Sequence, residues 1–265
     1  MTDPVVVYGM LCLSAFAAGA VNSVAGGGTL LTFPTLLGVL ARKSAEMAGV
    51  WANATSTLAL LPGSLAGAFA YRSELAECRR LVLLLIAPSM IGGAVGSLLV
   101  TEFPPTVFDT LIPWLILSAS VLFMIQGPLK RLTGTGRHGP PGWKTGVAVV
   151  FGQFLIAVYG GYFGAGIGIL MLAVLPFMGT QSIHQTNAAK TILAACINGV
   201  TVIIFVVKGF VIWPYALAMA VAAIAGGYVG GRVARRLPAV YVRTVVIVVG
   251  LTIGGYYLWK QIVGA

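Results

Sequence analysis

Residues 19–34 read GAVNSVAGGGTLLTFP, and they interrupt an apolar segment that extends from about residue 5 to residue 41. A second segment of the same kind, at about residues 145–182, contains YGGYFGAGIG at residues 159–168. Each segment is about 38 residues long, which is too long for one membrane helix at the usual tilt. Because clustered glycines destabilise a helix, the sequence predicts a chain break inside each segment.

The composition is typical of a membrane protein. Of the 265 residues, 58% are apolar and 8% are charged, against roughly 25% charged in a soluble domain. This composition excludes a soluble enzyme. The net charge of +10 predicts basic loops that face the cytoplasmic leaflet, and we expect no nucleic-acid partner. No basic region precedes the first apolar run, so we also expect no removable signal peptide.

The distribution of basic residues distinguishes two topologies. If each long segment crosses the membrane once, the chain has eight spans, with nine basic residues inside and seven outside. If each long segment crosses and returns, the chain has ten spans and both termini outside, with twelve basic residues inside and four outside. The second count satisfies the positive-inside rule. We therefore expect an all-α polytopic membrane protein of about ten transmembrane segments.

Topology and sequence both predict an internal repeat. Ten spans make two halves of five, and an odd number inverts the second half relative to the first. One shift of 134 residues superposes identical residues, namely Asn53, Ala54 and Thr57 on Asn187, Ala188 and Thr191, and Gly92, Gly93 and Gly96 on Gly226, Gly227 and Gly230. The predicted parts are a first repeat (1–130), a basic Gly/Pro-rich cytoplasmic linker (131–144) and a second repeat (145–265). The glycine spacings predict close helix packing.

The two predicted breaks point to a ligand site. Upstream of the 134-residue register the shift becomes 140, which places Gly26 and Gly28 on Gly166 and Gly168. Lipid cannot satisfy the backbone amides that a break frees, so these amides must line protein or a wet cavity, where helix N-termini attract anions. A purely structural kink is the alternative. The candidate lining residues are Asn22, Gly27, Gly28, Thr29, Gly166 and Gly168.

A second polar motif occurs in both halves, as NATS at residues 53–56 and as NAAKT at residues 187–191. Helical spacing places Asn53 and Ser56 on one face, and it does the same for Asn187, Lys190 and Thr191. These side chains either hydrogen-bond between helices or contact a ligand. Lys190 in turn either reaches the cytoplasmic interface or faces a central cavity and pairs with an anion.

The remaining ionisable residues favour an anion and argue against catalysis. The carboxylates Glu46, Glu102 and Asp109 lie near span ends, so a cation site of mid-membrane carboxylates is not expected. His184 has no carboxylate nearby in sequence, and three scattered cysteines predict neither a disulfide framework nor a metal cluster. We therefore expect no enzyme, no metal and no cofactor.

The stretch at residues 19–34, followed by NATS at 53–56, resembles the sulfite exporter TauE/SafE family, also called TSUP. The resemblance continues through residues 159–168 and through QTNAAKT at 185–191, so it covers nearly the whole chain. It implies a secondary transporter of the bacterial inner membrane that moves small sulfur-containing anions, such as sulfite or organosulfonates. It also implies outward transport in many members, with protons as a candidate coupling ion.

Residues and resemblance together predict a transporter that works by alternating access. Its expected partners are a small anionic substrate and membrane lipid, and the glycine-rich helix faces permit a homodimer. The alternatives are a sodium-coupled symporter of another small anion and a non-transporting membrane scaffold. The predicted substrate site comprises Asn22, Gly27, Gly28, Thr29, Asn53, Ser56, Gly166, Gly168, Asn187, Lys190 and Thr191.

Overall fold

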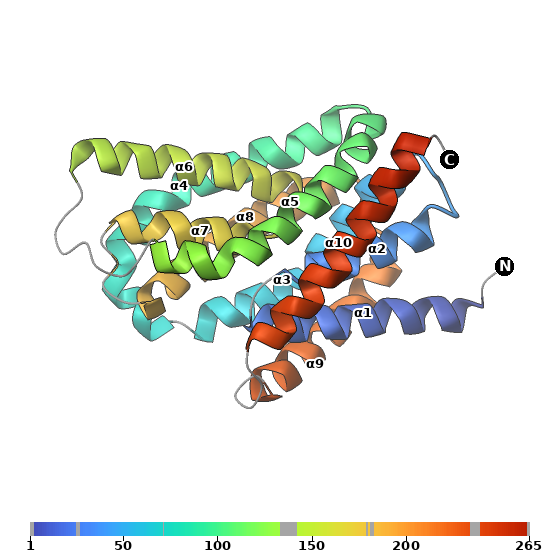
Figure 1. The fold of residues 1–265 in the computed structure, drawn as a ribbon, viewed down its shortest axis with the longest axis horizontal. Coiled ribbons are helices and arrows are strands. Elements are labelled where there is room, and N and C mark those ends of the chain that lie inside the picture. Colours follow the sequence, from blue (N-terminus) through green and yellow to red (C-terminus); the bar gives the residue numbers. More distant parts are fainter. Residues whose placement is uncertain are drawn as a thin grey trace.

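The computed structural model describes residues 3–24, 27–70, 72–132, 142–178, 180, 183–233 and 239–263. Within these ranges the chain is all-helical, with ten α-helices and one short 3-10 helix (Figure 1). The helices are α1 (Pro4–Val24), α2 (Thr29–Leu40), α3 (Ala48–Ala70), α4 (Arg72–Glu102), α5 (Pro105–Leu132), α6 (Trp143–Tyr162), α7 (Ile167–Val174), η1 (Leu175–Met178), α8 (Ile183–Val207), α9 (Trp213–Val233) and α10 (Ala239–Val263). The all-α prediction is confirmed for the described residues.

Six of the described helices, α1, α4, α5, α6, α8 and α10, contain a stretch long and apolar enough to cross a membrane. The apolar stretches of α2, α7 with η1, and α9 are shorter. With its 12 residues, α2 is about 18 Å long, whereas the hydrocarbon core of a bilayer is about 30 Å thick. The count of ten spans and the inverted orientation of the two halves therefore stay predictions.

Many large apolar side chains are exposed, and part of the interior is polar. Leu83, Val221 and Ile262 are more than half exposed, on three different helices. Asn53 and Gln153, in contrast, are almost completely buried. This arrangement suits a lipid environment, in which exposed side chains are apolar and buried polar groups hydrogen-bond inside the protein.

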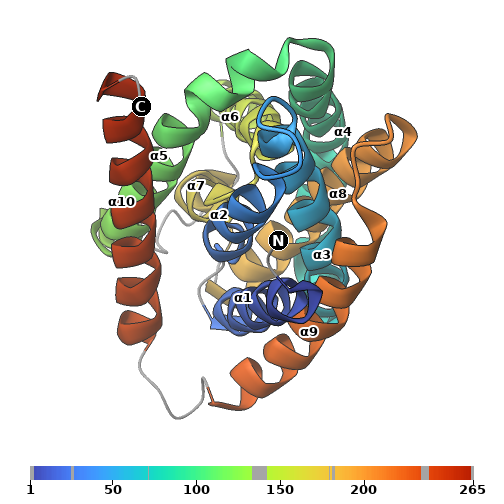
Figure 2. The same cartoon turned by 90° about the vertical axis from the view of Figure 1, so that its right-hand side faces the viewer.

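Helices of one half pack mainly against helices of the other half. The helix α1 packs on α9 and α4 packs on α6, while α3 contacts α8 and α5 contacts α10. Figure 2 shows α1 against α9 and α5 beside α10. Each helix has a counterpart five helices along the chain, so that α1 corresponds to α6 and α4 to α9. When every helix is replaced by its counterpart, the same set of pairs results. Such reciprocity is what two related halves would produce.

Glycines allow these helix pairs to approach closely. A Cβ atom added at Gly96 would collide with the backbone of Val158, between α4 and α6. A Cβ atom added at Gly226 would collide with the backbone of Phe16, between α1 and α9. Both helix pairs are therefore closely packed at these glycines.

Each of the two long apolar segments is split where its glycines predict a break. The first lies between the end of α1 at Val24 and the start of α2 at Thr29, and the second lies between Tyr162 of α6 and Ile167 of α7. Each short helix packs back on the helix before it. In Figure 1, α2 leads back toward the end of the molecule at which α1 begins. The chain thus reverses its direction at each break, so that the short helix runs back along the preceding helix.

Candidate functional site

The first break is held by glycines and by one asparagine. Gly27 has φ +89°, a left-handed backbone conformation that favours glycine, and a Cβ atom there would collide with the ring of Phe123 on α5. The Gly28 amide donates a hydrogen bond to Oδ1 of Asn22 at 2.7 Å. Asn22 is exposed, so its amide bridges the break at an accessible surface.

The second break is built on the same plan with different residues. Gly164 and Gly166 have φ +79° and +81°, and Gly166 is the residue immediately before α7. The hydroxyl of Tyr159 donates to the carbonyl of Ala165 at 2.9 Å, which bridges this break from the last turn of α6. In both breaks a polar side chain of the preceding helix thus holds the backbone in a non-helical conformation.

Successive polar residues of α3 bond to three other segments of the chain. Nδ2 of Asn53 donates to the carbonyl of Tyr162 at 2.9 Å, next to the second break. Oγ1 of Thr55 accepts from the Ile212 amide at 3.1 Å, at the start of α9. The hydroxyl of Ser56 lies 2.5 Å from the hydroxyl of Thr32 on α2. The NATS motif is therefore a buried polar junction.

The corresponding motif on α8 lies beside the second break. The side chain of Lys190 runs along Gly168 in the first turn of α7, with Cδ 3.3 Å from the position of a Cβ atom on that glycine. The hydroxyl of Thr191 donates to the Asn187 carbonyl at 2.8 Å, as Thr57 donates to the Asn53 carbonyl at the same distance in the first half. Lys190, Asn187 and Thr191 are half-buried.

The structure divides the predicted site residues into two groups. The group at the first break contains Asn22, Gly27, Gly28, Thr29 and Ser56, and the group at the second break contains Gly166, Gly168, Asn187, Lys190 and Thr191. Asn53 belongs by sequence to the first half, but it bonds to the second break. The two groups are thus linked by α3, where Asn53 and Ser56 are one helical turn apart.

Four further residues help to form the breaks without having been predicted as site residues, namely Thr32, Phe123, Tyr159 and Tyr162. Thr32 lies one turn beyond Gly28 and accompanies Ser56, and helical spacing from the glycine break is a signal that could have selected it. Phe123 acts through its ring, and Tyr162 acts through a backbone carbonyl. Neither role has a local sequence signature.

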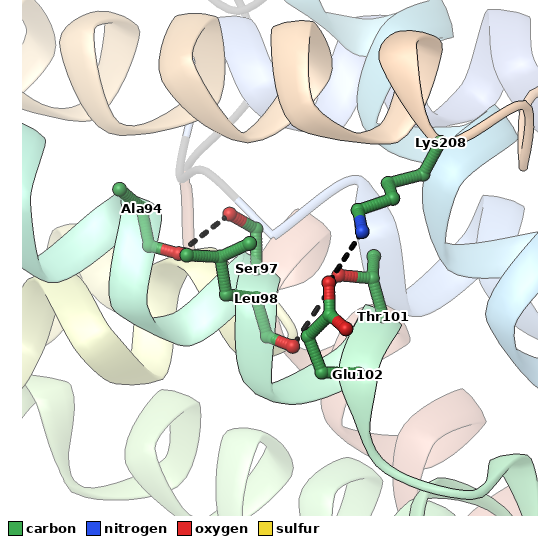
Figure 3. Close-up of polar contacts among 6 residues, drawn as sticks. All are labelled: Ala94, Ser97, Leu98, Thr101, Glu102 and Lys208. Atoms are coloured by element: carbon green, nitrogen blue, oxygen red, sulfur yellow. Dashed lines mark hydrogen bonds and ion pairs between the residues drawn. The ribbon is translucent and has the colours of Figure 1, made fainter.

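An ion pair lies away from the breaks. Lys208, which follows α8, pairs with Glu102, the last residue of α4 (Figure 3). Figure 3 also shows hydroxyls of α4 bonding within their own helix, from Ser97 to the Ala94 carbonyl at 3.0 Å and from Thr101 to the Leu98 carbonyl at 3.3 Å. Both charged side chains are well exposed, so the pair links two helix ends and contributes little to stability.

The described residues contain no group of three His, Cys, Asp or Glu side chains placed to hold a metal ion. They do contain buried polar atoms that have no hydrogen-bond partner, among them Oδ1 of Asn53. An unpaired buried acceptor is unfavourable, and in native proteins it is uncommon. The NATS junction is therefore fully buried and incompletely satisfied at the same time.

Fold and site together define a class of protein. Several apolar helices, a lipid-compatible surface and two broken segments with polar groups around them are features of multi-pass membrane transporters. The family model described as "Sulfite exporter TauE/SafE" matches residues 11–257. The chain therefore belongs to the TauE/SafE family of membrane transporters, as its sequence motifs predicted.

Curated relatives agree with this membership. The "Probable membrane transporter protein YfcA" of Escherichia coli (strain K12) is 27% identical over 263 residues, which are 98% of this chain and 93% of the relative. A "Probable membrane transporter protein" of Haemophilus influenzae is 23% identical over 251 residues, 93% of this chain and 92% of the relative. "Probable membrane transporter protein ORF9" of a Sinorhizobium species is 23% identical over 248 residues, which are 92% of this chain and 89% of the relative. No solved structure gives a significant match.

Proposed function

We propose that this protein is a secondary transporter that exports small sulfur-containing anions, such as sulfite or organosulfonates, across the bacterial inner membrane with proton coupling. Membership of the sulfite exporter family supports the substrate class. The apolar helices support an inner-membrane location, because the inner membrane holds helical proteins while outer-membrane proteins are typically β-barrels. Ten spans in two inverted five-helix repeats complete this proposal.

The contact between Lys190 and Gly168 is the observation that best supports an anionic substrate. Cε of Lys190 lies 3.9 Å from a Cβ position on Gly168, and the ammonium is one bond further along the side chain. Gly168 is in the first turn of α7, where the helix dipole presents its positive end. A positively charged side chain beside the positive end of a helix favours binding of an anion at that place.

The other candidate residues surround this centre in the proposal. Asn187 and Thr191 flank Lys190, Gly166 precedes α7, and the first break contributes Asn22, Gly27, Gly28 and Thr29. Asn53 and Ser56 support the site from the buried side of α3, through their bonds to Tyr162 and to Thr32. Amides, hydroxyls and one ammonium replace the hydration shell of the anion, and the two halves rock around the site to give alternating access. No covalent bond forms or breaks.

Transport into proteoliposomes tests the proposal. We expect uptake of radiolabelled sulfite or of a small organosulfonate that responds to a pH gradient and that falls at least about tenfold in Lys190→Ala, because one charge-assisted contact contributes ~1.5–3 kcal/mol. The matched control is Lys208→Ala, which removes an exposed lysine just after the same helix and should leave uptake unchanged. Absence of uptake of both compounds by correctly folded protein would contradict the proposal and favour a non-transporting scaffold. Equal uptake with and without sodium would exclude sodium coupling.

Cysteine labelling tests the ten-span topology. Ten spans place Lys208 outside, whereas eight spans place it inside, and Arg79 is inside in both topologies. Both side chains are exposed, so cysteines at these positions are accessible to reagents. We expect a membrane-impermeant maleimide to label Lys208→Cys from outside intact cells and to label Arg79→Cys only after permeabilisation. Labelling of both variants only after permeabilisation would favour eight spans.

A further inference from the structure

The NATS motif of α3 contains deeply buried polar groups near the breaks. Asn53 is 1% exposed, and Thr55 and Ser56 are 0% exposed. Their hydrogen-bond partners belong to α2, to the end of α6 and to the start of α9. A ligand-facing row would leave polar atoms accessible, whereas Nδ2 of Asn53 and the hydroxyls of Thr55 and Ser56 bond to protein groups. The burial therefore distinguishes Asn53 and Ser56 from the half-buried Lys190 on α8.

Asn53 is bound to the second break in a defined orientation. The Tyr162 carbonyl can only accept a hydrogen bond, so the amide nitrogen of Asn53 must face it. Oδ1 then points to the opposite side, where it is buried and has no partner. The described conformation thus satisfies one end of the amide and leaves the other end unpaired. A second arrangement of the break that supplies a donor to Oδ1 would relieve this imbalance.

Ser56 is bound to the first break through Thr32. The hydroxyls of Ser56 and Thr32 lie 2.5 Å apart, and Thr32 also contacts the Gly28 carbonyl at 3.3 Å. Thr32 is itself 0% exposed, so the whole chain of contacts is buried. One turn of α3 thus separates a bond to the first break from a bond to the second break.

The helix that follows the first break also touches the second break directly. The rings of Phe33 on α2 and Phe163 in the second break pack edge to face, with centroids 5.2 Å apart. Both rings are almost completely buried, at 0% and 1% exposure. A displacement of α2 or of the second break is therefore transmitted through this aromatic contact as well as through α3, because close-packed interiors transmit strain.

We propose that Asn53 and Ser56 are positioning residues that couple the two chain breaks, so that the breaks change conformation together and not independently. This role rests on the proposed transport function, in which both breaks border one substrate site. It differs from direct substrate contact, because the hydrogen-bonding groups of Asn53 and Ser56 hold Tyr162 and Thr32 instead of the anion. The unpaired Oδ1 of Asn53 marks the contact that rearranges when the breaks move.

Hydrogen exchange measured on the purified full chain tests the coupling without requiring transport. In Asn53→Leu and in Ser56→Ala we expect exchange to rise about tenfold in both breaks, in peptides covering residues 27–32 and 160–169, although each variant removes a bond to only one break. Thr32→Val removes the same bond as Ser56→Ala from the other side and serves if Ser56→Ala fails to fold. The matched control is Thr57→Val, whose hydroxyl bonds within α3. Faster exchange only in the directly bonded break would overturn the proposal.

Transport kinetics separate positioning from substrate contact. We expect Asn53→Leu and Ser56→Ala to lower the maximal rate about tenfold while the half-saturating substrate concentration changes less than about twofold, and Ser56→Thr to recover most of the rate. A raised half-saturating concentration at an unchanged maximal rate would show direct substrate contact and overturn the proposal. If the native protein moves no sulfite or organosulfonate while both breaks still respond together in exchange, the proposed substrate class fails and the coupling stands. If transport occurs and each break responds alone, the coupling fails and the transport function stands.

Discussion

The two chain breaks share a plan but differ in polarity. Each uses glycine with positive φ, and each is bridged by a polar side chain from the preceding helix, Asn22 in the first break and Tyr159 in the second. The 134-residue register places Ser56 and Lys190 at equivalent positions, and each contacts the short helix of its own break. One break is thus completed by a neutral hydroxyl and the other by a cation.

Burial follows the same division. Ser56 is 0% exposed and bonds to Thr32, which is also fully buried. Lys190 is only half-buried and lies along Gly168 at the start of α7. A duplicated backbone arrangement can therefore place a closed, neutral contact in one half and a positively charged, more accessible contact in the other. In the proposed function, the second break attracts the anion and the first break responds through α3.

Placing a lysine at position 56 and a serine at position 190 should reveal the largest difference between the two breaks. We expect Ser56→Lys to destabilise the fold by several kcal/mol, because it buries an ammonium group where a small hydroxyl had a partner. Lys190→Ser should fold normally, because Lys190 is half-buried and serine is found at the equivalent position. Size-exclusion profiles and thermal unfolding in detergent measure both effects. A well-folded Ser56→Lys variant would show that the first break also accommodates charge.

Glycine substitutions compare the backbone of the two breaks. Gly27→Ala should destabilise the protein by about 2–4 kcal/mol, since it combines a left-handed backbone with a collision against Phe123. Gly166→Ala should cost only about 1–2 kcal/mol, because the nearest atom is 3.6 Å from the added Cβ and the backbone conformation is the main penalty. Thermal unfolding of the two variants measures which substitution lowers the stability more.

Gly38→Ala is the control for these two substitutions. It adds a methyl group on α2 where nothing lies within 4 Å, so it should be neutral or stabilise by up to about 1 kcal/mol. If Gly166→Ala proved as damaging as Gly27→Ala, the second break would be as tightly enclosed as the first.

Removal of a bridging hydroxyl tests how the second break is held. Tyr159→Phe keeps the ring and loses the bond to the Ala165 carbonyl, so we expect a loss of about 1 kcal/mol and faster hydrogen exchange in residues 163–168. The exchange of residues 27–32 provides the comparison with the first break. Unchanged protection at residues 163–168 would mean that the glycine conformations hold the break without this bond.

The smallest effect is expected at the surface ion pair. Lys208→Gln should change stability by less than about 1 kcal/mol, because Lys208 and Glu102 are both well exposed. The comparison is with Lys190→Gln. The Lys190 side chain lies beside the positive end of α7, so we expect this substitution to impair transport of an anion. A large loss of stability in Lys208→Gln, measured by thermal unfolding, would identify the link between α4 and α8 as a structural support.

Most of the fold was predictable from local patterns. Apolar runs predicted helices, and the glycines at residues 26–28 and 160–168 predicted where two of the runs break. The candidate site was only partly predictable. Lys190 and Gly168 were both selected from sequence, but their contact was not, and the role of the Tyr162 carbonyl has no sequence signal because every residue has a carbonyl.

The sequence by itself determined the membrane class, the helical elements, the two breaks and the family, since these depend on composition, periodicity and local backbone preference. Only the tertiary structure decided which groups meet. Asn53 bonds to a carbonyl 109 residues away, and Thr55 bonds to an amide 157 residues away. Such pairings depend on how close-packed helices pass one another, and no local pattern encodes them. For this reason the packing distinguishes the buried junction on α3 from the half-buried lysine on α8.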